Sequence, residues 1–112
     1  MTKALWRKAL TLDKKYTKSM WEDLIKLIKG NYSITRADEN EAFIKIPKAE
    51  GFDIEIYPGL DISVHKFSIH VWDNRNGNKT IFSIEVDSLA AVINTIDTQL
   101  KEIPKKLKHN LL

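Results

Sequence analysis

The sequence predicts an α+β protein, built as a two-layer sandwich in which an antiparallel sheet carries its helices on one face. Three observations lead to this prediction. Apolar residues recur at helical spacing near both ends of the chain, they alternate with polar residues through its middle, and turn residues separate the alternating runs. We therefore expect four or five strands between an N-terminal and a C-terminal helix, with one shared core.

An amphipathic helix that ends at Gly30 is expected, beginning at Ser19 or as early as Asp13. Ser19 and Glu22 have the spacing of a capping box, and Gly30 is a natural residue to follow the last helical turn. The apolar stripe of this helix consists of Met20, Leu24, Leu27 and Ile28. Before it, residues 1–12 predict a short basic helix, on the spacing of Leu5, Ala9 and Leu12.

Alternation with a period of two governs residues 32–86, and strands are expected over 32–36, 42–47, 52–57, 62–72 and 80–86. In the fourth strand the apolar parity slips between Val64 and Phe67, which predicts a β-bulge near His65 and Lys66. Residues 73–78 contain Asn76-Gly77 and predict a hairpin turn. The inward residues expected of the last strand are Thr80, Phe82, Ile84 and Val86.

A second long helix follows the strands. Asp87 or Ser88 is expected to cap it, and Pro104 is expected to end or kink it. Residues 104–112 then form a basic tail, either as a further helical turn or as a frayed end. The apolar stripe of this helix consists of Leu89, Val92, Ile93, Ile96, Leu100 and Ile103.

Composition narrows the class of protein. With 112 residues and 43% apolar content, residues 1–112 are expected to form one domain. The absence of cysteine excludes disulfide scaffolds, thiol catalysis and cysteine-based zinc sites. No apolar run approaches the roughly 20 residues of a membrane span, and the first residues do not resemble a signal peptide, so a cytoplasmic protein is expected. No catalytic or cofactor motif is present, and we expect a non-enzymatic protein without cofactor or metal.

Basic residues gather at both ends of the chain. Residues 1–30 carry a net charge of +5, residues 31–100 carry −5 and residues 101–112 carry +3. Such ends favour binding to phosphates, although lysines on helix faces also serve simply as solvated surface. Lysine outnumbers arginine fifteen to three, so nucleic-acid binding would involve the backbone more than the bases. The residues predicted to contact nucleic acid are Arg7, Lys8, Lys14, Lys15, Lys18, Lys105, Lys106 and Lys108.

The sheet face away from the helices is the second candidate surface. Aromatic side chains on a solvent-facing sheet indicate a binding surface, either for a protein partner or for stacked bases. The alternative is ordinary cross-strand packing, covered by the ends of the chain or by a dimer mate. The residues predicted to contact a partner are Phe43, Tyr57, Lys66, His70 and Trp72. On the same face, His65 and His70 near carboxylates could hold a metal or exchange protons, but their spacing matches no metal motif and cross-strand pairing is the simpler interpretation.

Residues 67–103, FSIHVWDNRNGNKTIFSIEVDSLAAVINTIDTQLKEI, resemble in outline the C-terminal part of the positive-cofactor-four family. The resemblance implies a curved antiparallel sheet followed by a helix, a dimer, and binding of single-stranded DNA. It rests on element order over about a third of the chain. The basic and aromatic strand surface of that family is matched by Lys66, Trp72, Arg75 and Lys79. Acidic residues on the same face would repel phosphates, and the chain is therefore not assigned to the family; they are Asp53, Glu55 and Glu85.

Two functions follow from these surfaces. The first is a nucleic-acid-binding module that uses the basic helices and tail, and the alternative is a protein-interaction module, a regulator or inhibitor, that uses the aromatic sheet face. A homodimer is compatible with either.

Overall fold

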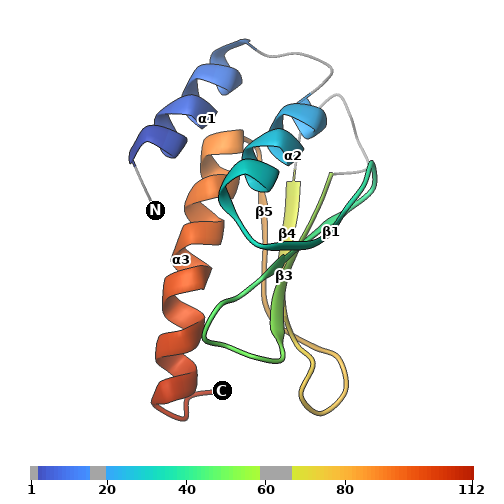
Figure 1. Cartoon of the computed structure of the whole chain (residues 1–112), viewed down its shortest axis with the longest axis vertical. Coiled ribbons are helices and arrows are strands. Elements are labelled where there is room, and N and C mark those ends of the chain that lie inside the picture. The colour runs from blue at the N-terminus through green and yellow to red at the C-terminus, as the bar shows by residue number, and fades with distance from the viewer. Residues whose placement is uncertain (1–2, 16–19, 59–66) are drawn as a thin grey trace.

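The structure is a computed structural model that describes residues 3–15, 20–58 and 67–112. Two helices precede five strands, and a long helix follows them (Figure 1). The helices are α1 (Lys3–Lys15), α2 (Met20–Asn31) and α3 (Leu89–Lys108). The strands are β1 (Ile34–Ala37), β2 (Ala42–Lys45), β3 (Phe52–Pro58), β4 (Phe67–Asp73) and β5 (Lys79–Val86).

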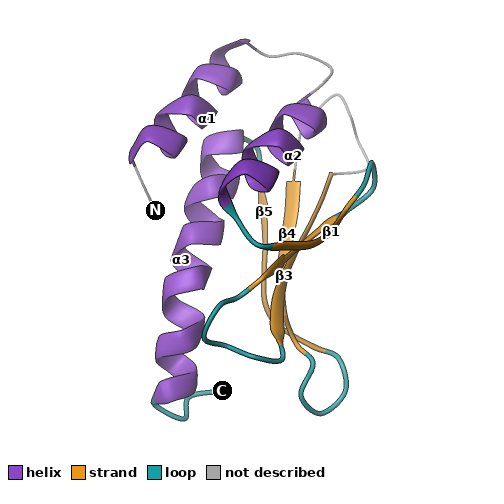
Figure 2. Cartoon of the chain, in the orientation of Figure 1, coloured by secondary structure: helices purple, strands orange, loops and turns teal. Residues whose placement is uncertain are grey.

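The five strands form one antiparallel sheet in chain order, so β1 and β5 are its edges. The helices lie on one side of the strands (Figure 2). This arrangement confirms the predicted α+β class, with its N-terminal and C-terminal helices on a single sheet face. None of the described helices is both long enough and apolar enough to cross a membrane.

The core lies between the sheet and the helices. Side chains alternate along β3 and β4, so Ile54, Ile56, Ile69 and Val71 are fully buried while the residues between them are half-buried. The helices complete the same core with the apolar stripes expected from their spacing, and the fully buried members are Ala9, Leu24, Ile28, Leu89, Val92, Ile93 and Ile96. The sheet therefore has one dry face and one face turned to water.

Helix α3 runs from Leu89 to Lys108 and includes Pro104. Ser88 caps it, because its Oγ accepts a hydrogen bond from the backbone N–H of Ala91 at 3.1 Å. Of the two alternatives for residues 104–112, the structure shows the further helical turn, since α3 continues through Pro104 to Lys108. A proline removes one backbone hydrogen bond. Buried Ile103 and half-buried Leu107, which pack against the core on either side of it, hold the next turn in place.

The end of α2 departs from the sequence prediction. Gly30 lies inside the helix, which ends one residue later, and the backbone N–H of Tyr32 still donates to the carbonyl of Ile28 at 2.9 Å. Strand β1 consequently begins at Ile34, two residues later than expected. The proposed cap at Ser19 and the bulge predicted at residues 65–66 lie outside the described residues.

A β-bulge does occur in the described part of the sheet, but on β5. The register between β4 and β5 shifts where Val71 pairs with Phe82 and Trp72 pairs with Thr80, which leaves Ile81 as the extra residue. Thr80 is therefore on the Trp72 side of the sheet, and its predicted inward position is wrong. Phe82, Ile84 and Val86 face the core side as expected, because they pair with inward residues of β4.

The predicted hairpin between β4 and β5 is present. Gly77 has a φ of +85°, a left-handed conformation that suits glycine in a tight turn. The Arg75 guanidinium in this turn is engaged by two neighbours. It pairs with the Asp73 carboxylate at 2.9 Å and lies 4.7 Å from the centroid of the Phe52 ring. This pairing lowers the pKa of Asp73 to about 2. Arg75 in this loop therefore stabilises the turn between β4 and β5.

Candidate functional site

The open side of the sheet, which we call the outer face, carries the side chains expected there. The strand register places them on one surface: Phe43, Lys45, Asp53, Glu55, Tyr57, Ser68, His70, Trp72, Ser83 and Glu85. The aromatic rings among them are half-buried, since neighbouring strands hold the rings against one another. Lys66 and His65, which were expected beside them, lie outside the described residues.

His70 is the centre of this face. Its Nε2 and the hydroxyl of Tyr57 form a hydrogen bond of 2.8 Å, and its Nδ1 and the hydroxyl of Ser83 form another of 2.6 Å. The Tyr57 and His70 rings also lie nearly parallel, with centroids 5.3 Å apart. Because both ring nitrogens are engaged, the imidazole is held in one orientation between strands β3 and β5. This cluster is a rigid polar and aromatic surface.

Beside His70, Trp72 forms a second fixed point. Its indole N–H donates to the carboxylate of Glu55 at 3.0 Å, across the β3–β4 pair. A shallow hollow of about 370 Å³ lies next to this ring, between it and the ring of Phe43. One oxygen of Asp53 is buried there without a hydrogen-bond partner in the described residues. Burial raises the pKa of Asp53, a hydrogen bond from Asn74 opposes the rise, and the charge of Glu55 adds to it.

The charge of the outer face is unfavourable for phosphates. Among the described residues it holds the cations Lys45 and Arg36 against the carboxyl groups of Asp53, Glu55 and Glu85. The Arg36 guanidinium lies 5.9 Å from the centroid of the Phe43 ring and already pairs with Asp38 and Glu41. Within residues 3–15, 20–58 and 67–112, no three histidine or carboxylate side chains gather as a metal site would require. The face is chemically suited to a neutral or basic protein surface, with Trp72 and Tyr57 as aromatic anchors.

Basic side chains collect instead on the last two turns of α3. Lys101, Lys105 and Lys108 recur at helical spacing on one side, with Lys106 adjacent, and all four are exposed. We call this set the lysine stripe. None of its ammonium groups forms an ion pair within the described part of the chain. At a rise of about 1.5 Å per residue, it extends along about 10 Å of helix.

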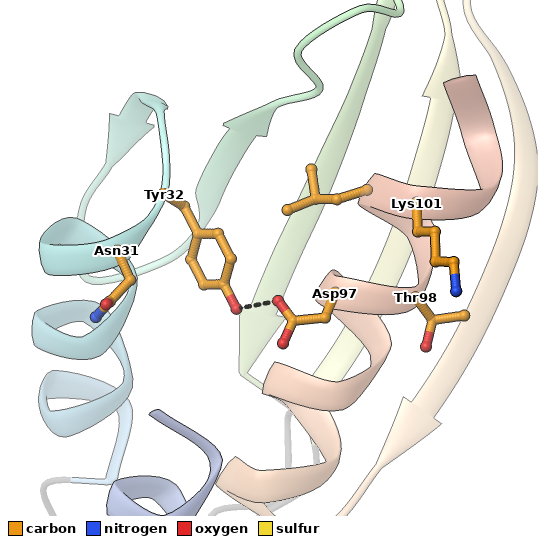
Figure 3. Close-up of a pocket in the computed structure, with 6 residues that line it drawn as sticks. Asn31, Tyr32, Asp97, Thr98 and Lys101 are labelled. Atoms are coloured by element: carbon orange, nitrogen blue, oxygen red, sulfur yellow. Dashed lines mark hydrogen bonds between the residues drawn. The ribbon is translucent and has the colours of Figure 1, made fainter. Parts of the chain in front are cut away.

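A groove borders the lysine stripe where the end of α2 meets α3 (Figure 3). On its inner side the Tyr32 hydroxyl donates to Asp97 at 2.7 Å. Burial and the Asp97 carboxylate raise the pKa of Tyr32 above its usual range, and burial raises the pKa of Asp97. Lys101 and Thr98 lie on the far side of Asp97 from Tyr32, so the rim of the groove presents a cation and a hydroxyl.

The N-terminal basic residues form a separate group. Arg7 and Lys8 are exposed on α1, and the backbone of Lys14 and Lys15 belongs to the end of that helix. Lys18 lies outside the described residues. Helix α1 packs near the beginning of α3, whereas the lysine stripe occupies its end (Figure 1). The described residues therefore present two basic areas at opposite ends of α3.

The sequence prediction missed Lys101 and Thr98, which the structure adds to the basic surface. The spacing of four and seven residues from Lys101 to Lys105 and Lys108 carried the signal. Comparison with protein-family models, with curated proteins and with solved structures finds no match to this chain.

Proposed function

We propose that this protein binds the backbone of a nucleic acid through the lysine stripe at the end of α3. The observation that supports the proposal is a row of three exposed lysines with an adjacent fourth, none of which forms an ion pair among the described residues. The first of the row, Lys101, lines a groove. Ammonium groups that have no carboxylate partner are available to replace the counterions of a phosphate chain.

The residue types define what kind of recognition is expected. Lysine is a point charge without the planar fork of arginine, so it binds phosphate oxygens without reading base edges. Thr98 can add a hydroxyl contact at the rim, although its hydroxyl also donates to the Asn94 carbonyl at 2.8 Å. Asp97 faces Tyr32 in the groove and would repel a phosphate placed deep inside. We therefore expect binding along the rim, with little sequence preference and a steep dependence on salt.

The test is an anisotropy titration of fluorescent single- and double-stranded oligonucleotides at two salt concentrations. The triple variant Lys105→Ala, Lys106→Ala, Lys108→Ala should weaken binding equally across sequences and flatten the salt slope by about one to two units. A matched control removes three other exposed lysines, through Lys26→Ala, Lys29→Ala and Lys45→Ala, and should retain most of the affinity. Absence of binding to every oligonucleotide at low salt would refute the proposal.

A second candidate function is protein binding through the outer face. It is supported by the fixed geometry of Trp72, which lines the hollow at Phe43, and of Tyr57, which is hydrogen-bonded to His70. Under this hypothesis Trp72→Ala weakens a complex by about 30-fold or more, as aromatic anchors commonly do. The lysine stripe would then influence mainly the rate of association. If nucleic acid is the ligand instead, Trp72→Ala leaves oligonucleotide affinity unchanged.

A further inference from the structure

Strand β5 is an edge strand of the sheet that the described residues form. It is the last strand of the sheet and pairs on one side only, with β4. Of the two edges it is the longer, with eight residues against the four of β1. Helix α3 packs against β4, so the core side of β5 is left partly open. An exposed edge of this kind is a template for pairing with another strand.

Ile84 is the clearest consequence of this arrangement. It pairs with fully buried Ile69 and so points to the core side of the sheet, yet 41% of its surface is exposed. Phe82 and Val86, on the same side of β5, are only partly buried. The core thus continues past β4 as a short apolar row that the described residues cover only in part.

We propose that a second copy of this chain covers the row, through antiparallel pairing of β5 with β5. The bulge at Ile81 limits the regular part of the edge to residues 82–86, whose centre is Ile84. In a two-fold pairing centred there, Ile84 faces Ile84 of the second copy, and Phe82 faces Val86. The sheet would become ten-stranded, and the apolar row of each copy would lie against the other.

The polar side of β5 is compatible with the same register. It places Ser83 opposite Glu85, so that two Glu85 carboxylates do not face each other. A register centred one residue later would set Glu85 directly against Glu85, which like-charge repulsion disfavours. Phe82–Val86 contributes far fewer residues than the roughly 20–30 a side of a standard interface, so this dimer is expected to be weak. The inference is independent of nucleic-acid binding, because the lysine stripe lies on a different element.

Sedimentation equilibrium on the full chain from about 5 to 500 µM tests the association, because a weak dimer dissociates within that range. We expect a monomer–dimer equilibrium that Ile84→Lys weakens by at least tenfold. The matched control is Trp6→Lys, the same change at another exposed apolar residue, which is 46% exposed. It should leave association unchanged. A monomer at every concentration would overturn the proposal and leave the edge open to a strand of a different protein.

A cysteine pair tests the register, and it stays informative if Ile84→Lys fails to fold. The chain has no cysteine, so each single substitution introduces the only thiol. Directly opposed residues bring their Cβ atoms close to the span of a disulfide, whereas diagonal ones do not. Under mild oxidation with oxidised glutathione, Ile84→Cys should therefore cross-link quickly and Ser83→Cys slowly. The reverse order of rates would overturn the Ile84-centred pairing.

Discussion

Gln99 is a buried polar side chain on the apolar side of α3, and replacing it tests how the core is packed. Only 6% of its surface is exposed, and its Oε1 has no hydrogen-bond partner among the described residues. An unsatisfied buried polar group costs about 1–3 kcal/mol. Methionine has a similar length and nearly the same helix propensity, so Gln99→Met removes that cost with little other change.

The expected gain is measurable by thermal unfolding. A chain of this length loses roughly 0.24 kcal/mol of stability per degree near its midpoint, at about 2.1 cal/mol/K per residue. A gain of about 1–3 kcal/mol should therefore raise the Tm by about 4–12 °C. Circular dichroism at a fixed protein concentration provides the assay, with fixed concentration needed because association also shifts the Tm.

A second substitution at the same position should lower the Tm instead of raising it. Gln99→Glu would place a carboxylate among Ile96, Ile103 and their neighbours, and should lower the Tm at pH 7 more than at pH 4. The reasoning is refuted if Gln99→Met leaves the Tm unchanged or lowers it. That result would mean that the Gln99 amide is satisfied in solution and contributes to stability.

Three further predictions concern stability. Ile96→Ala, which empties a fully buried site, should cost about 2–5 kcal/mol in denaturant unfolding, and a loss below about half a kcal/mol would show that the site is not in the core. Tyr32→Phe should lower the free energy of unfolding by about 1–3 kcal/mol, because it leaves the Asp97 carboxylate without its hydrogen-bond donor. Asp97→Asn keeps an acceptor for the Tyr32 hydroxyl, so its Tm at pH 7 should match or exceed that of the wild type. Burial raises the pKa of Asp97, so ionisation opposes folding, and any gain from Asp97→Asn should vanish once acid protonates that carboxyl. For Asp73 the ionised carboxylate stabilises the fold, because Arg75 lowers its pKa to about 2. This stabilisation is present above pH about 4 and is lost as the pH falls toward 2. The unfolding free energies of the wild type and Asp73→Asn should therefore converge in acid.

The sequence alone was sufficient for the fold class and for most of the core. Burial alternates along β3 and β4 as the apolar pattern predicted, and the predicted stripe of α3 contains Ile93 and Ile96, both fully buried. Periodicity is a local property, so a residue's preference for the core side can be read without knowing what covers it. The outer-face positions of Tyr57, His70 and Trp72 followed from the same parity.

The errors fall where tertiary packing overrides a local signal. Pro104 and Gly30 are both local signals for a helix end, but packing carries both helices past them. The bulge at Ile81 turned Thr80 to the other face, and nothing in the alternation around it distinguishes that position. Local signals give the intrinsic preference of a segment, and contacts with distant segments decide whether that preference is followed.

For the candidate surfaces, too, the sequence determined some features and the tertiary structure determined others. The sequence by itself determined that the ends are basic and the middle acidic, and that aromatic residues occupy one side of the strands. Only the tertiary structure decided that the basic ends are two separate areas, that Lys101 joins Lys105 and Lys108, and that Ile84 is left 41% exposed. The contact of Tyr32 with Asp97 joins residues 65 positions apart. Such proximity depends on how the helices cross the sheet, and that geometry is set by the packing of the whole core.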